Sequence, residues 1–203
     1  MALILDILLG AAFAALASGA VQIWRRQMEA DRHEALRALA ARRGWALTEG
    51  GRGLGRSGSM RITPRGGHPW TLEVRPEDGR TDFAAESPRW TEGHLVLAAA
   101  APDRRDAAAL VAEVPSMGFL RPAEAPAGFL MLNDGDPGRR LPLEDVAQLL
   151  RAWQPVVRGR KGLPLLMLTP EGIRLRLGHP LKRADQVERF ADLALVISRI
   201  IGP

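Results

Sequence analysis

The first 24 residues differ from the rest of the chain in their pattern of hydrophobic and polar positions. Ile7 to Trp24 is an 18-residue run that contains no charged side chain. As an α-helix it would be about 27 Å long, enough to cross most of a hydrocarbon core. Positions 7–21 also lack the polar stripe of a helix that lies on a soluble domain. The pattern predicts a transmembrane anchor over residues 1–24.

The residues that follow this run indicate its orientation. Trp24 lies where an interfacial aromatic side chain is favoured, and Arg25 and Arg26 lie where cations meet lipid headgroups. Residues 25–65 hold ten arginines against four acidic residues. Because positive charge is retained on the cytoplasmic side, we expect a single-pass protein of the inner (cytoplasmic) membrane, with its C-terminal domain in the cytoplasm.

A cleaved signal peptide is the competing interpretation of the same segment. Ala15-Leu16-Ala17 and Ser18-Gly19-Ala20 both have the small-x-small form that signal peptidase accepts. Against cleavage, the first six residues carry Asp6 and no basic residue, whereas the arginines follow the apolar run. This charge order is the reverse of the order in secreted segments. A periplasmic domain therefore stays as the alternative to an anchored one.

Residues 25–44 are predicted to continue the anchor as a juxtamembrane helical stalk. Leu36 and Leu39 lie among alternating charges, and Gly44 is the residue type that commonly ends a helix. Together with Trp45, the two leucines favour packing of the last turns on the domain that follows. The chain is thus expected to comprise an anchor at 1–24, a stalk at 25–44 and one soluble domain at 45–203.

The soluble part alternates between strand and helix patterns. Residues 70–75 alternate strictly, which predicts a half-buried antiparallel strand with Trp70, Leu72 and Val74 on one face. Thr169-Pro170-Glu171-Gly172 has the residues of a type I turn and predicts a hairpin. The remaining strands are expected at 45–48, 60–63, near 83, 94–100 and 129–132, and in the hairpin at 165–168 and 173–177. Helices are expected at 103–114, 142–153 and 183–201, the first of them capped by Asp103.

The final helix carries more apolar surface than one packing face needs. Its sheet-facing residues should be Phe190, Ala194, Ile197 and Ile201. Leu193 and Ile200 then lie on one flank, and Val196 lies among the charged positions. These last three residues form a candidate interaction surface, unless the first helix of the domain covers it.

The order of elements predicts an α+β fold, in which an N-terminal transmembrane helix precedes an antiparallel sheet with helices packed on it. In ending with a hairpin and a helix, the domain is similar to the α/β sandwich of bacterial secretion-type chaperones, a likeness of element order that implies no activity. The short anchor, the Arg-rich stalk and the Gly44-Trp45 junction resemble those of uncharacterised single-pass membrane proteins of bacteria. That resemblance implies a layout and no functional residues.

Composition and motifs exclude several kinds of site. The chain has no cysteine, which excludes thiolate nucleophiles, disulfides, zinc fingers and iron–sulfur clusters. Residues 53–58 match G-x-G-x-x-G, but a strand-like segment follows where dinucleotide binding needs a helix. Asp134 and Asp136 resemble the start of a calcium loop, yet Arg139 replaces the required glycine, so we predict a turn. The histidines lack pairing at ligand spacing and are expected to be structural or exposed: His33, His68, His94 and His179. No catalytic, cofactor or metal residue is predicted.

Two functions remain open at this point. The favoured one is a membrane-anchored, protein-binding or adaptor module, whose partners are membrane lipid through the N-terminal helix and another protein or a second copy of the chain. The alternative is an enzyme whose site is assembled across the fold. Nucleic acid is not expected as a partner, because aromatic residues are only 5% and no basic helix lies outside the stalk.

Overall fold

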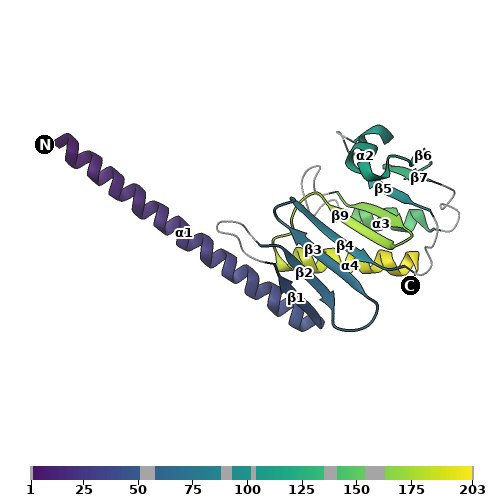
Figure 1. Ribbon diagram of the computed structural model, residues 1–203, viewed down its shortest axis with the longest axis horizontal. Coiled ribbons are helices and arrows are strands. Elements are labelled where there is room, and N and C mark those ends of the chain that lie inside the picture. Colours follow the sequence, from purple (N-terminus) through teal and green to yellow (C-terminus); the bar gives the residue numbers. More distant parts are fainter. Residues whose placement is uncertain are drawn as a thin grey trace.

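The computed structural model describes residues 2–50, 58–87, 93–101, 104–134, 141–153 and 163–202, with the side chains of the first helix described at 21–24 and 27–43. Its first element, α1 (Ala2–Arg43), is one continuous helix of 42 residues. Gly44 follows at φ 66°, the left-handed conformation that glycine adopts at a helix end, as predicted. The N-terminal part of α1 extends away from the domain (Figure 1). Within the described part of the chain, no helix is both long enough and apolar enough to cross a membrane.

The last turns of α1 are packed into the domain, as the leucine pattern predicted. Leu36, Leu39 and Ala40 are buried and join the larger hydrophobic core. Arg42 donates a hydrogen bond to Glu188 at 2.9 Å, and Arg43 pairs with Asp192. Apolar burial together with these ion pairs fixes the end of α1 against the C-terminal helix.

The described residues form a nine-stranded antiparallel sheet in the order β1-β2-β3-β4-β9-β8-β5-β7-β6. The hairpin β8–β9 lies in the middle of the sheet and joins the first four strands to the last three. The strands are β1 (Trp45–Glu49), β2 (Met60–Pro64), β3 (Trp70–Arg75), β4 (Arg80–Ala85), β5 (Leu95–Ala99), β6 (Arg121–Ala123), β7 (Phe129–Asn133), β8 (Leu165–Thr169) and β9 (Gly172–Leu177).

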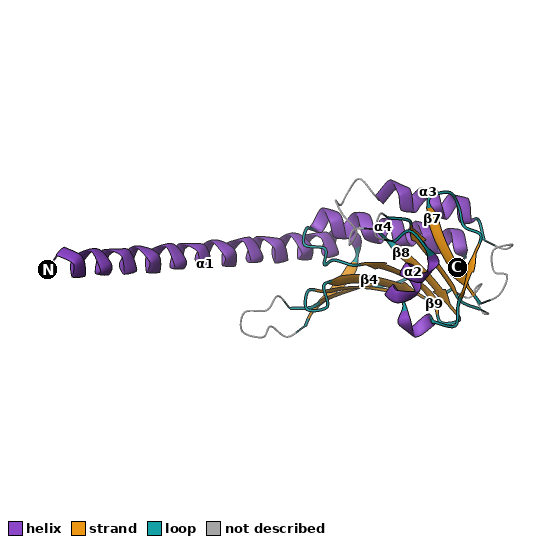
Figure 2. Ribbon diagram, turned by 90° about the horizontal axis from the view of Figure 1, so that it is seen from above, coloured by secondary structure: helices purple, strands orange, loops and turns teal. Residues whose placement is uncertain are grey.

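Helices cover the two faces of this sheet unequally (Figure 2). One face packs on α3 (Leu143–Trp153), α4 (Ala184–Ile201) and the end of α1, which together enclose the larger core. The other face packs on α2 (Ala107–Glu113) and the short 3-10 helix η1 (Pro115–Met117). The residues of this smaller core on the sheet come from β5, β7 and β8. The architecture confirms the predicted α+β class with helices on an antiparallel sheet.

One predicted boundary needs correction, and one strand was not predicted. The helix expected from 103 begins at Ala107, because the carboxylate of Asp106 caps it by accepting a hydrogen bond from the N–H of Ala109 at 2.9 Å. Asp103, the predicted cap, lies outside the described residues. No sequence pattern predicted β6, which is three residues long and contains Pro122. Its strand geometry is set by pairing with β7, which no local pattern reveals.

The C-terminal helix packs as its periodicity predicted. Phe190, Ala194, Ile197 and Ile201 are buried in the larger core. The ring of Phe190 lies 5.4 Å from that of Trp153 on α3 in an edge-to-face arrangement, so α4 also fixes its neighbouring helix.

Candidate functional site

The face of β1, β2, β3, β4 and β9 that points away from the larger core carries two parallel rows of side chains. Cross-strand pairing places Arg61, Glu73, Asp82 and Arg176 side by side in a charged row. The neighbouring row is small on β2, β3 and β4: Thr71 pairs with Ala84, and Thr63 is the next outward residue on β2. On β9 this row ends at Arg174, which pairs with Ala84. Side chains of such different length make one row a ridge and the other a depression.

Ion pairs hold the charged row in place. Asp82 lies 2.6 Å from Arg176 and 3.0 Å from Arg80, while Glu73 pairs with Arg61 and Arg75. The hydrogen bond with Glu73 raises the pKa of Arg75 above its ordinary value. Each of these pairs is partly exposed and stabilises the fold only slightly, but together they order a ridge of long side chains.

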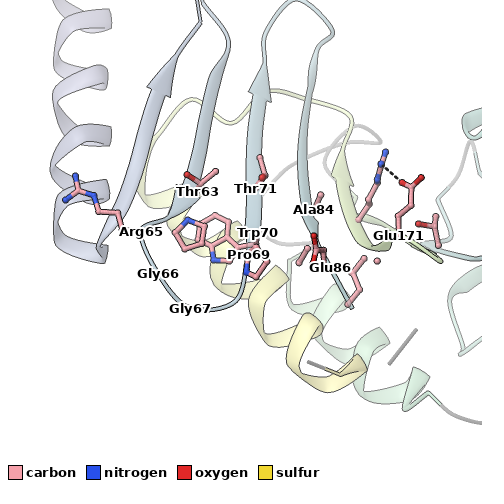
Figure 3. Close-up of a pocket in the computed structure, with 16 residues that line it drawn as sticks. Thr63, Arg65, Gly66, Gly67, Pro69, Trp70, Thr71, Ala84, Glu86 and Glu171 are labelled. Carbon is pink, nitrogen blue, oxygen red and sulfur yellow. Dashed lines mark hydrogen bonds and ion pairs between the residues drawn. The ribbon is translucent and has the colours of Figure 1, made fainter. Parts of the chain in front are cut away.

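Beside this ridge, at the ends of the strands, lies a depression of about 440 Å³ that we call the strand-end trough. Its floor includes the half-buried side chains of Thr63, Thr71 and Ala84. Figure 3 shows Thr63 and Thr71 side by side, with Arg65 in the turn between β2 and β3 and Glu171 at the far side. The turn of the β8–β9 hairpin, which carries Glu171, therefore closes the trough opposite the β2–β3 turn.

The walls of the trough are fixed by local contacts. His68 places its Nε2 atom 2.7 Å from the carbonyl oxygen of Glu86, which ties the β2–β3 turn to the end of β4. Gly172 has φ 130°, and a Cβ atom there would lie 2.2 Å from the carbonyl oxygen of Ala85. Only glycine therefore allows β9 to begin so close to β4.

Thr169 lines the trough with a side chain that is almost completely buried. It is the last residue of β8, and its side chain is on the same sheet face as Met167 of the smaller core. Thr169 is only 8% exposed, and its Oγ1 atom has no hydrogen-bond partner among the described residues. Buried hydroxyl groups are normally paired, but this oxygen is itself inaccessible, so the trough offers a ligand the hydroxyls of Thr63 and Thr71 rather than that of Thr169.

Comparison with known proteins does not extend this description. Neither family models, curated proteins nor solved structures give a match to the chain. The candidate site therefore rests on its own geometry.

The residues singled out from the sequence lie elsewhere. Trp24 is 60% exposed on α1, whereas the side chains of Ile7, Arg25 and Arg26 lie outside the described residues. The turn predicted after Asp134 and most of the glycine motif at 53–58 are also outside them. Met60–Pro64, the element that follows this motif, is a strand as expected.

The candidate surface on α4 is only partly open. Leu193 and Ile200 are half-buried and pack against the larger core, whereas Val196 is 38% exposed. Helix α1 meets α4 through Glu188 and Asp192. Since consecutive residues point about 100° apart on a helix, Leu193 faces away from this contact. Val196 is the open member of the predicted surface.

The structure also brings together a pair that no local pattern showed. His94 and Asp134 are 40 residues apart, and the Nδ1 atom of His94 lies 2.7 Å from a carboxylate oxygen of Asp134. Such a pair can orient a general base, but it needs a nucleophile to act on, and the hydrogen bonds among the described residues supply none. Those residues also contain no group of three acidic or histidine side chains able to hold a metal ion.

Proposed function

We propose that this protein is a membrane-anchored adaptor whose domain binds another protein on the cytoplasmic side of the inner membrane. The observation that carries the proposal is that only one end of α1 is packed on the domain. Its last turns are buried in the domain, and its N-terminal part extends away from it. A helix in this arrangement can connect the domain to a second structure, which we propose is the membrane.

The anchor itself is supported by the residues at the start of the stalk. Ile7 to Trp24 contains no charged side chain. Ile23 and Trp24 are 62% and 60% exposed, an arrangement that places large apolar side chains in water unless a bilayer surrounds them. We propose membrane lipid as the partner of this segment.

The stalk arginines form two groups, and the pair next to the apolar run supports the orientation. Arg37, Arg42 and Arg43 form ion pairs with acidic residues of the domain, and Arg32 donates to the carbonyl oxygen of Leu181 at 3.1 Å. Arg25 and Arg26 directly follow the apolar run and are assigned to the headgroups.

Protein binding is supported by the sheet face that carries the charged row and the trough. This face presents polar side chains on a surface whose position relative to α1 is fixed. A second copy of the chain would be an alternative partner on the exposed side of α4, where Val196 lies.

Topology fusions test the anchor and its orientation. A C-terminal fluorescent protein should be bright, and a C-terminal alkaline phosphatase should be inactive, because the domain stays in the cytoplasm. The protein should also stay with the membrane pellet in alkaline carbonate. An active phosphatase would exclude the cytoplasmic orientation. A mature chain that begins near Ser18 or Val21 by mass measurement would exclude the anchored form.

The adaptor role is tested by crosslinking of the full chain in intact membranes. A crosslink between a domain residue and another polypeptide, located by mass spectrometry, is the expected result. Crosslinks confined to residues of the same chain would contradict it.

A further inference from the structure

The strand-end trough has the dimensions of an extended peptide. Thr63, Thr71, Ala84 and Arg174 occupy successive strands, three strand spacings or about 14 Å in total. An extended chain advances about 3.3 Å per residue, so four to five residues span this length. The charged row borders the trough along one side, and the strand-end turns border it along the other.

The charges of the trough favour an uncharged occupant. Its lining holds two cationic side chains, Arg65 and Arg174, and two carboxylates, Glu86 and Glu171. Arg174 and Glu171 already pair with each other at 3.2 Å. A nucleic acid or an anionic lipid surface would face unmatched carboxylates here, whereas a polar, uncharged segment would not.

The hydroxyl groups of the trough match a peptide backbone. Thr63 and Thr71 line it with side chains that both donate and accept hydrogen bonds, as do the N–H and C=O groups of an extended chain. Both side chains are half-buried on the floor of the trough, so an extended segment lying there would pair with them.

The position of the trough favours a protein over a lipid. The N–H of Arg65, at the start of the β2–β3 turn, donates to the carbonyl oxygen of Gly44 at 3.2 Å, so this turn lies beside the end of α1. Trp24 is 20 residues earlier in the chain, about 30 Å along the helix. On the proposed orientation, the trough therefore opens far from the headgroups.

We propose that the strand-end trough binds an extended, uncharged polar segment of a partner protein. The main chain of this segment lies across β2, β3, β4 and β9 and pairs with the hydroxyls of Thr63 and Thr71. The inference rests on the proposed adaptor function and assigns its docking site.

A displayed library of random octapeptides tests this site. The library is selected against the full-length protein in nanodiscs, after depletion on empty nanodiscs, and the affinity of the recovered peptides is measured by fluorescence anisotropy. Thr71→Trp fills the floor, and Thr48→Trp is its matched control, since Thr48 is an outward threonine on β1 outside the trough. Thr63→Val removes a hydroxyl that lines the trough while keeping the shape of the side chain. Thermal melting of each variant confirms that it is folded.

We expect uncharged, polar peptides whose affinity falls at least about tenfold in Thr71→Trp and about fivefold in Thr63→Val, the worth of one hydrogen bond. Thr48→Trp should bind them like the unmodified protein. No enrichment, selection of uniformly charged peptides, or equal binding to folded Thr71→Trp would overturn the proposal. If the peptide selection failed while the fusions placed the domain in the cytoplasm and intermolecular crosslinks were found, only the assignment of the trough as the docking site would be wrong. An active phosphatase fusion would contradict only the proposed orientation.

Discussion

His94 and Asp134 form a closed pair at one end of the sheet: the backbone N–H of His94 donates to one carboxylate oxygen of Asp134 at 2.6 Å, and its ring nitrogen lies 2.7 Å from the other. The rings of His94 and Phe119 lie 5.1 Å apart in an edge-to-face contact. Asp134 thereby connects the beginning of β5 to the end of β7 and to the segment that follows η1.

This pair predicts a pH-dependent contribution to stability. Burial alone would raise the pKa of Asp134, but the hydrogen bonds and charge of His94 outweigh it and lower the pKa below its ordinary value of 3.8. The stabilisation is therefore complete above the ordinary pKa and is lost as the pH falls through the lower, folded-state pKa. Asp134→Asn should cost about 1 kcal/mol at pH 7. Urea unfolding at pH 7 and in acid checks this, and a difference that stays constant with pH would contradict it.

A second prediction concerns the buried arginine of the smaller core. The side chain of Arg104 is 4% exposed, pairs with both carboxylate oxygens of Glu113, and donates to the carbonyl oxygen of Ala99. Arg104→Ala should lower the free energy of unfolding by about 1 to 3 kcal/mol, because it removes the hydrogen bonds of a buried guanidinium to Glu113 and to the carbonyl oxygen of Ala99. The exposed pair Arg183–Asp185 is the control, and Arg183→Ala should leave the urea midpoint unchanged. Equal effects of the two variants would argue against the buried pair.

The attachment of α1 is tested by two truncations on the same helix. Leu36 is 1% exposed in the larger core, so Leu36→Ala should cost about 2 to 5 kcal/mol. Met28 is 54% exposed before the docked turns, and Met28→Ala should stay within about 0.5 kcal/mol. Denaturant unfolding of the full chain in detergent measures both. If Leu36→Ala matched Met28→Ala, the end of α1 would not be part of the core.

A further prediction separates packing from association on α4. Phe190 is fully buried against Trp153, and Phe190→Ala should cost about 3 to 5 kcal/mol. Val196→Glu, at an exposed position, should leave stability nearly unchanged and weaken association if this surface binds a partner. Ile200→Glu should lower stability, because Ile200 is half-buried and packs against the larger core. Sizing and circular dichroism distinguish the outcomes, and a stable Ile200→Glu variant that no longer associates would instead assign Ile200 to the interaction surface.

The stalk charges predict weak lipid binding once the proposed anchor is removed. A chain that begins at Gln27 keeps Arg32, Arg37, Arg42 and Arg43, whose hydrogen bonds go to the domain. Because these side chains are already engaged, the fragment should bind anionic vesicles weakly, and salt should abolish the binding. Vesicle sedimentation measures this, and binding that survives high salt would indicate apolar insertion instead.

The local elements could be predicted from the sequence because their signals are local. Strict alternation located β3, and the residues of the Thr169–Gly172 turn located the β8–β9 hairpin. The periodicity of the final helix identified its buried face. Each of these patterns lies within one or two adjacent elements.

The arrangement of the strands and the trough could not be predicted, because both depend on distant pairing. Ala84 pairs with Arg174, and only this pairing of β4 with β9 places the hairpin in the middle of the sheet. Alternation indicates that Thr71 points opposite to Trp70, but it does not reveal that Thr63 lies beside it. The pairs His94–Asp134 and Arg104–Glu113 likewise form only when the fold brings their elements together.

The continuity of α1 fixes the orientation of the domain about the helix axis. No proline or flexible linker interrupts residues 2–43, and the last turns of the helix are packed in the larger core. The domain therefore cannot rotate independently of α1. Rotation of the helix about its axis would therefore turn the trough by the same angle. One residue inserted between Arg26 and Arg32 would turn the trough by about 100° about the helix axis but would move it only about 1.5 Å along that axis. In the proposed membrane-anchored form, the trough would then point away from a partner that it faces in the unmodified protein.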